Sequence, residues 1–109
     1  MAFDERLSER IRRRLGKRKE LAEKKMFGGI AFLLNGNMCV GVYKQDLIVR
    51  LDPQDTDRAL AEPHTRVFDL SGRPMKGWIL VQSGGLKDEK TLGKWVGLSV
   101  DYALSLPKK

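Results

Sequence analysis

The sequence predicts a two-layer α+β sandwich, in which an antiparallel sheet of about five strands packs with N-terminal and C-terminal helices. Three observations predict this fold. Asn35-Gly36 stands between two apolar runs, and this dipeptide favours a two-residue hairpin turn because both central residues need positive φ. Segments before and after the strands repeat apolar residues at helical spacing. Short turns join neighbouring strands without crossovers, which makes the sheet antiparallel.

The length of 109 residues fits one domain, so we expect a single domain over residues 1–109. No apolar run approaches the roughly 18 residues of a membrane span, and the N-terminus is charged, unlike a secretory signal peptide. We therefore expect a cytoplasmic protein. One cysteine and one histidine exclude an internal disulfide and argue against a Cys/His zinc site.

The first helix is expected to begin at Asp4, which has the side chain of a good N-cap, and to end or bend at Gly16. Its buried stripe is Leu7, Ile11 and Leu15, at i, i+4 and i+8. Leu21 and Ala22 predict a further helical turn or two that leads to Lys25.

The basic character of the chain is concentrated in this first region. The formal net charge is +7, and residues 1–25 hold ten Lys/Arg against five Asp/Glu. A cluster surrounds the break at Gly16: Arg12, Arg13, Arg14, Lys17, Arg18 and Lys19. This cluster predicts either contacts with nucleic-acid phosphates or a solvated helix face whose charges pair with interspersed glutamates.

The segment from Met26 to Leu51 is expected to form three strands. Pairing across Asn35-Gly36 sets a register that assigns side chains to faces. The predicted pairs are Leu33 with Met38, Ala31 with Val40, Phe32 with Cys39, and Ile30 with Gly41. A second turn at Gln45-Asp46 is expected to pair Val49 with Val42 and Leu51 with Val40.

This register predicts two apolar faces on one sheet. The second face would carry Ile30, Phe32, Cys39, Tyr43, Ile48 and Arg50. Because such a face is not polar enough to be left in water, either another helix or another protomer must cover it. Phe32, Tyr43 and Ile48 are therefore candidate residues of a homodimer interface.

The second half of the chain predicts a short helix, one or two strands and a long helix. Asp52-Pro53 has the pattern of a helix start, and Glu62-Pro63 ends that helix. Residues 64–69 lead through a turn at 71–74 to a strand over 75–81, where Gly77 marks a bulge or a close backbone approach. Asp88 caps the last helix, which packs across the sheet and stops at Pro107. Its apolar stripe is Leu92, Trp95, Val96, Tyr102, Ala103 and Leu106.

The residues that can carry chemistry form no constellation in the sequence. His64 is either a general base without an identifiable partner or a loop histidine. Cys39 is flanked by apolar residues, which favours a buried, inert thiol. Phe27-Gly28-Gly29 lacks the spacing of phosphate-binding loops and fits a strand start with a bulge or close packing. Asp52, Asp55 and Asp57 are explained as capping and first-turn residues, so no catalytic residue, metal or cofactor is predicted.

A second cationic group flanks the turn beside Trp78. Arg66, Arg73 and Lys76 form either a patch for an anion or an acidic partner, or a solvated turn whose arginine packs on the tryptophan.

The chain strongly resembles the N-terminal domain of the TfoX/Sxy family, from about residue 5 to Pro107. The resemblance rests on a combination of motifs in order: KMFGG at 25–29, GNM at 36–38, LIVRL at 47–51, PH at 63–64 and GRPMKGW at 72–78. The family's motif positions are Phe27, Gly28, Gly29, Arg73, Met75, Lys76 and Gly77, and the family has no established catalytic residues to carry over.

The resemblance implies a bacterial, cytoplasmic α+β domain, similar to secretion-chaperone-like folds, without known enzymatic activity. In two-domain members this domain belongs to regulators of natural competence, which act with the cyclic-AMP receptor protein at promoters. Because the sequence stops at Lys109, we expect a stand-alone N-terminal domain without the C-terminal helical domain of those members.

We therefore expect a non-enzymatic regulatory or protein-interaction domain. Its partner would be the transcription machinery or a second copy of the chain as a homodimer. The alternative is a small nucleic-acid-binding module that uses the cationic cluster. An enzyme that depends on His64 is the third choice.

Overall fold

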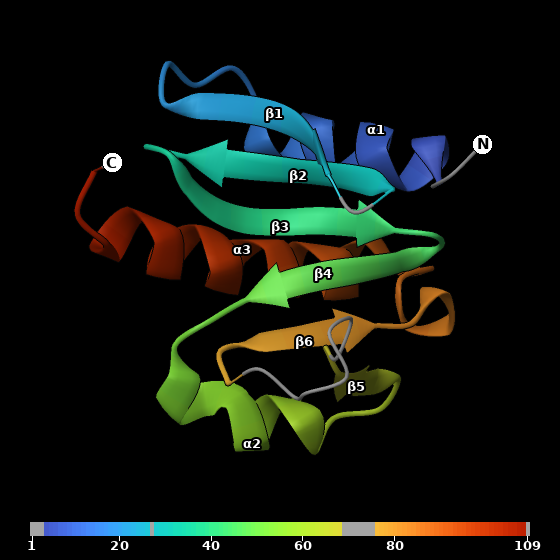
Figure 1. Ribbon diagram of the computed structural model, residues 1–109. Helices are drawn as coiled ribbons and strands as arrows, with labels where there is room; N and C mark the ends of the chain where they lie inside the picture. Colours follow the sequence, from blue (N-terminus) through green and yellow to red (C-terminus); the bar gives the residue numbers. More distant parts are fainter. Residues whose placement is uncertain (1–3, 27, 69–75, 109) are drawn as a thin grey trace.

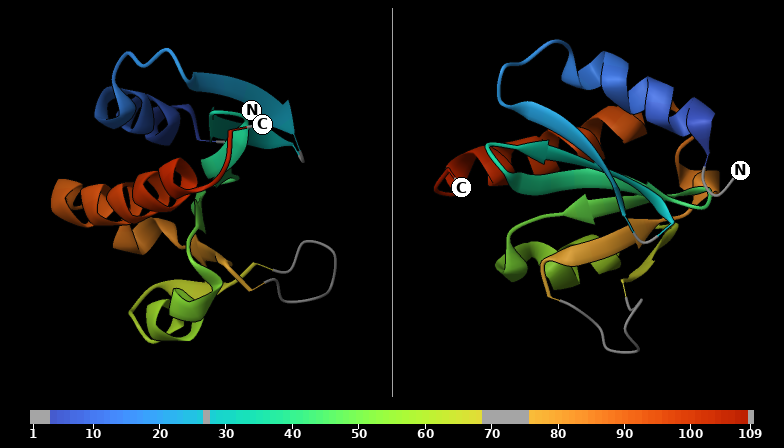
Figure 2. Two further views of the ribbon diagram at one scale, coloured as in Figure 1. Left: turned by 90° about the vertical axis from the view of Figure 1, so that its left-hand side faces the viewer. Right: turned by 45° about the horizontal axis from the view of Figure 1, so that its top comes forward.

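The computed structural model describes residues 4–26, 28–68 and 76–108. In this part of the chain, six strands form one antiparallel sheet in the order β1-β2-β3-β4-β6-β5, and the helices lie on one side of it (Figures 1 and 2). The strands are β1 (Leu21–Met26), β2 (Gly29–Leu34), β3 (Asn37–Tyr43), β4 (Asp46–Arg50), β5 (Thr65–Val67) and β6 (Trp78–Val81). The helices are α1 (Glu5–Leu15), α2 (Thr56–Leu60) and α3 (Glu89–Ser105), with 3-10 turns at Pro53–Asp55 and Ser83–Gly85. This architecture confirms the predicted α+β fold, with six strands in place of about five.

The core lies between the sheet and the helices α1 and α3, which run side by side across one face (Figure 2, left). The helix residues in this core include Ile11, Leu92 and Trp95, which are at most 2 % exposed. The caps that start these helices are the predicted ones, because Asp4 accepts hydrogen bonds from the N–H groups of Arg6 and Leu7, and Asp88 accepts one from Lys90.

The hairpin between β2 and β3 has the predicted turn but a different register beyond it. Asn35 and Gly36 have φ of 53° and 82°, and Leu33 pairs with Met38 as expected. The register then shifts between Phe32 and Leu33, so that Cys39 is the extra residue of a β-bulge. Beyond the bulge, the observed pairs are Phe32 with Val40, Ala31 with Gly41, and Ile30 with Val42. The three pairs predicted for Phe32, Ala31 and Ile30 were therefore wrong. The bulge turns Phe32 and Ile30 toward the face that the helices cover.

The turn between β3 and β4 lies one residue earlier than predicted. Tyr43 pairs with Asp46 around Lys44-Gln45, and Lys44 has a φ of 57°. Val40 therefore pairs with Val49, and Val42 pairs with Leu47. The pairs predicted from a Gln45-Asp46 turn were wrong by two residues in register. A shift of two residues keeps every side chain on its face, so the apolar pattern does not distinguish the two registers.

Residues 21–25 belong to a strand, and the prediction of helical turns there was wrong. Leu, Ala, Glu and Lys are good helix formers, but β1 pairs with β2 at every residue from Leu21–Leu34 to Met26–Gly29. Backbone pairing with a neighbouring strand overrides the weak local preference. Gly28 has a φ of +75° between the two strands, so β2 begins at Gly29 rather than at the start of the FGG motif. Phe27 lies outside the described residues.

Gly77 makes the predicted close approach, although it precedes β6 instead of lying within it. Its φ is +86°, and a Cβ there would lie 3.1 Å from the carbonyl oxygen of Leu51. The Gly77 N–H donates to Thr56 Oγ1 at 2.7 Å, and its carbonyl accepts from Leu51 N–H. These bonds fix the start of β6 against the start of α2, which ends at Leu60, before Glu62-Pro63.

The second face of the sheet holds a smaller apolar cluster. Ile48, Leu80 and Phe68 are buried there, and Met38, Tyr43 and Trp78 pack against them while partly buried. The candidate dimer residues are thus separated: Phe32 lies on the opposite, helix-covered face and is 0 % exposed. Ile48 is also 0 % exposed within one chain, which leaves Tyr43 as the predicted interface residue that is partly accessible. No helix in the described ranges is long and apolar enough to cross a membrane.

Candidate functional site

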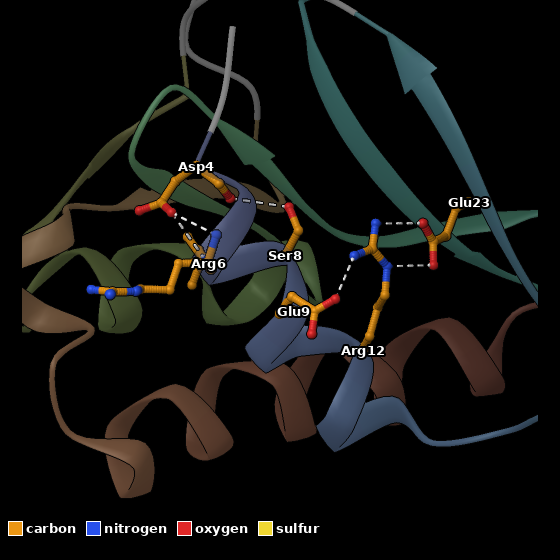
Figure 3. Close-up of polar contacts among 7 residues, drawn as sticks. Asp4, Arg6, Ser8, Glu9, Arg12 and Glu23 are labelled. Atoms are coloured by element: carbon orange, nitrogen blue, oxygen red, sulfur yellow. Dashed lines mark hydrogen bonds and ion pairs between the residues drawn. The ribbon is translucent and has the colours of Figure 1, made fainter. Parts of the chain in front are cut away.

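The cationic cluster at the end of α1 is partly neutralised by carboxylates (Figure 3). Arg12 donates to both carboxylate oxygens of Glu23 on β1, at 2.9 and 3.0 Å, and to Glu9 at 3.5 Å. The hydrogen bond to Glu23 raises the pKa of Arg12 above its ordinary value. The fork-shaped pair ties α1 to the edge strand of the sheet.

Arg14 and Arg18 also have partners within the chain. Arg14 lies 3.4 Å from the Glu89 carboxylate, which also accepts from Arg10 Nε at 2.5 Å. The hydrogen bond from Arg10 lowers the pKa of Glu89. Arg18 donates to the Leu15 carbonyl at 2.9 Å. In the described ranges, Arg13, Lys17 and Lys19 are the cluster members that are exposed and whose side chains have no hydrogen bond or ion pair.

The two residues considered for catalysis are held by structural contacts. His64 is exposed and has a φ of +65°. Its backbone carbonyl accepts a hydrogen bond from Gln82 N–H at 2.7 Å. It packs closely on Gly85, where an added Cβ would lie 2.7 Å from the Cβ of His64. Cys39 is buried, and burial raises its pKa to about 12. Among the residues that the structure describes, no group of three His, Cys, Asp or Glu is placed to hold a metal ion.

Among the described residues, the arginine that packs on Trp78 comes from a strand and not from the turn. Arg66 and Lys76 are exposed, whereas Arg73 and Met75 lie outside the described residues. The guanidinium on the Trp78 ring belongs to Arg50, 5.2 Å from the ring centroid and 5.6 Å from that of Tyr102. Arg50 and Trp78 are cross-strand partners on β4 and β6, a pairing that becomes visible once the strand order is known.

A cleft with a volume of about 410 Å³ runs between α2 and α3. We call it the α2–α3 groove. Its apolar lining residues are Leu51, Ala59, Trp95 and Leu98. Its charged lining residues are Asp52, Asp55, Arg58, Glu62 and Asp101, and Tyr102 and Ser105 line its end near the C-terminus of α3.

The local sequence explains how the groove arises. Asp52 and the 3-10 turn lead the chain from β4 into α2, below α3 in the left view of Figure 2. Trp95 is 2 % exposed and forms part of the core, but Leu98 is 45 % exposed and lies outside the buried stripe of α3. The sequence prediction did not identify this groove. Its signal in the sequence is an apolar and an acidic residue on α3, Leu98 and Asp101, which are three positions apart and lie outside the predicted core stripe.

Comparison with known protein families gives one result that decides the classification. A family model described as the TfoX N-terminal domain matches residues 13–103. The chain belongs to this family. No curated protein and no solved structure matches the sequence.

The family match covers all six strands of the sheet, most of the cationic cluster and most of the α2–α3 groove. It begins within the cationic cluster, at Arg13, and ends in the last part of α3, at Ala103. All the apolar lining residues of the α2–α3 groove fall within it. The apolar lining of the groove in this chain therefore lies within the matched residues rather than in a flanking segment.

Proposed function

We propose that this TfoX-like regulatory domain acts by binding another protein, and that the α2–α3 groove is the binding surface. The observation that carries the proposal is Leu98, a large apolar side chain that is 45 % exposed in a groove of about 410 Å³. Exposed apolar side chains over a concave apolar floor are typical of binding sites. Leu51, Ala59 and Trp95 form that floor and are at most 7 % exposed.

A non-enzymatic role agrees with the environments of the chemically capable groups. A thiol with a pKa of about 12 is protonated at neutral pH, so Cys39 lacks the thiolate that a nucleophile needs. Asp4, Asp52 and Asp88 accept hydrogen bonds from backbone N–H groups as caps. These carboxylates serve the fold, which supports binding rather than turnover as the function.

Site-specific photocrosslinking in cells tests the groove as a protein-binding surface. A photoreactive residue at Ser105, in the groove, is expected to give a protein adduct of defined mass, whereas one at Leu104, exposed but outside the lining, is not. Adding Leu98→Asp should remove the adduct, because a carboxylate replaces the apolar contact. Circular dichroism of each variant checks the fold. Equal adducts at both positions, or none at Ser105, would contradict the proposal.

Nucleic-acid binding is the second candidate, and one observation favours it. Arg13, Lys17 and Lys19 are exposed without partners among the described residues, and Lys24 and Lys25 on β1 are exposed as well. If these five cations contact phosphates, counterion release predicts a loss of affinity for duplex DNA of about 500-fold between roughly 50 and 200 mM salt. Fluorescence anisotropy with a labelled duplex measures this. Alanine at Arg13, Lys17 and Lys19 should weaken binding, and absence of binding at the lower salt eliminates this candidate.

A further inference from the structure

We propose that the α2–α3 groove takes a basic amphipathic segment of another protein, with apolar side chains toward the groove floor and Lys or Arg on its flanks. This inference rests on the proposed function and adds the chemistry of the partner. It follows from the charge, the helix end and the apolar floor of the groove.

The charge of the groove is opposite to that of the chain. Four carboxylates and one guanidinium line it, in a protein with a net charge of +7. Asp55 pairs with Arg58, and Glu62 pairs with Lys94. Within the described ranges Asp52 and Asp101 have no ion pair, and Asp52 accepts one hydrogen bond, from Gln54 N–H at 2.9 Å. The groove therefore holds two carboxylates whose charge no cation of the described residues offsets. These charges favour a cationic partner.

The end of α3 adds to this negative potential. The helix has 17 residues, its last turn holds no basic side chain, and Tyr102 and Ser105 of that turn line the groove. The C-terminus of a helix carries a partial negative charge, which Lys or Arg in the last turn often offsets. Here an arginine or lysine of the partner can take that place.

The floor of the groove requires apolar groups from the same partner. Covering Leu98 is favourable when an apolar side chain does so, and a segment that carries charge alone would leave this apolar surface without a matching contact. An amphipathic helix that presents residues at i, i+3 and i+4 supplies both kinds of contact from one short segment. The volume of about 410 Å³ accommodates a few such side chains.

A second copy of this chain does not fit this description. Its densest run of cations is residues 12–19, and the apolar residues beside those cations are Ile11 and Leu15. Both are buried in their own core, at 0 % and 2 % exposure. The segment therefore offers charge without apolar anchors, which assigns the groove to a different protein.

Three labelled model peptides of about 18 residues test the inference, each with leucines at i, i+3, i+4 and i+7. The remaining positions are lysine in the first, glutamine in the second and glutamate in the third. The basic peptide is expected to bind at least about tenfold more tightly than the other two, because rim carboxylates attract cations and repel anions. Fluorescence anisotropy at low and moderate salt measures the three affinities.

Matched variants locate the binding. Leu98→Ser, and the pair Asp52→Asn with Asp101→Asn, should each weaken the basic peptide by about fivefold or more, since asparagine keeps the cap at Asp52 but removes its charge. Leu104→Ser and Asp57→Asn are controls, because both residues are exposed and lie outside the groove lining. Equal weakening by the controls would overturn the inference.

The outcomes separate this inference from the proposed function. If the glutamine peptide binds as tightly as the basic one and loses affinity in Leu98→Ser, the groove binds proteins but does not select basic ones. If no peptide binds while the Ser105 crosslink forms, the partner has other chemistry. A dimer that Leu98→Ser dissociates would assign the groove to a second copy. Each of these results overturns the inference.

Discussion

At the scale of single residues, Cys39 gives a prediction about alkaline pH. Its pKa is about 12 in the folded chain, above the ordinary thiol value of 9.0. Between these values the unfolded thiol ionises and the folded one does not, so its contribution to stability is complete below pH 9 and is lost as the pH rises toward 12. At pH 10.5 this loss is about 2 kcal/mol.

Urea unfolding at pH 8 and pH 10.5 measures this loss. Cys39→Ala lowers the free energy of unfolding at pH 8 through lost packing. Between pH 8 and pH 10.5, the free energy of unfolding should fall by about 2 kcal/mol less in this variant than in the wild type. Lysine and tyrosine titrate in both proteins, so the difference between the two decreases isolates Cys39. Equal decreases would show that the thiol ionises freely in the folded chain.

Two helix caps and the first hairpin turn were predicted correctly, whereas the strand register beyond that turn was not. The Asp4 and Asp88 caps and the Asn35-Gly36 turn depend on a few consecutive residues, and all three were predicted from their side chains. The bulge at Cys39 depends on packing of Phe32 against helices, for which no local signal exists. Because of this extra residue, Phe32 lies in the core instead of at the predicted dimer interface.

At the scale of elements, β1 shows why composition alone misassigned a segment. Its residues favour a helix, yet the edge of β2 offers a full ladder of backbone hydrogen bonds. The α2–α3 groove was missed for a related reason. Asp52 was fully explained as a cap, Leu98 lay outside the predicted core stripe, and the two are far apart in the sequence, so only the fold brings them to one cleft.

The Arg12–Glu23 pair provides a test of how β1 is held against α1. Both side chains are about one-third exposed, so we expect a coupling energy of about 0.5 to 1 kcal/mol, near the upper end for surface pairs because both carboxylate oxygens are used. A double-mutant cycle with Arg12→Gln and Glu23→Gln measures it. The Asp55–Arg58 pair is the control, since the Arg58 side chain is 80 % exposed, and its coupling should be smaller. A larger coupling for Asp55–Arg58 would contradict this view.

At the scale of the whole molecule, the two charged surfaces lie on different parts of the fold. The exposed cations proposed for nucleic-acid contact belong to the α1–β1 region, whereas the carboxylates of the groove lie between α2 and α3. Figure 2 shows α1 and α2 on opposite sides of α3. Charges more than a Debye length apart are largely screened at physiological salt. The two surfaces can therefore serve different partners without competing.

The homodimer expected from the sequence remains a prediction, and the revised register changes which residues test it. Of the predicted interface, Phe32 and Ile48 are fully buried, so a dimer through the second sheet face would use Met38, Tyr43 and Trp78, which are partly buried. Light scattering coupled to size exclusion should show a dimer at high concentration, and Met38→Lys should return it to a monomer by burying an unpaired charge at the interface. Leu98→Lys, in the groove on the other side of the sheet, should leave the mass unchanged. A monomer at every concentration would contradict the predicted homodimer. A dimer that dissociates with Leu98→Lys but not with Met38→Lys would place the dimer interface in the α2–α3 groove.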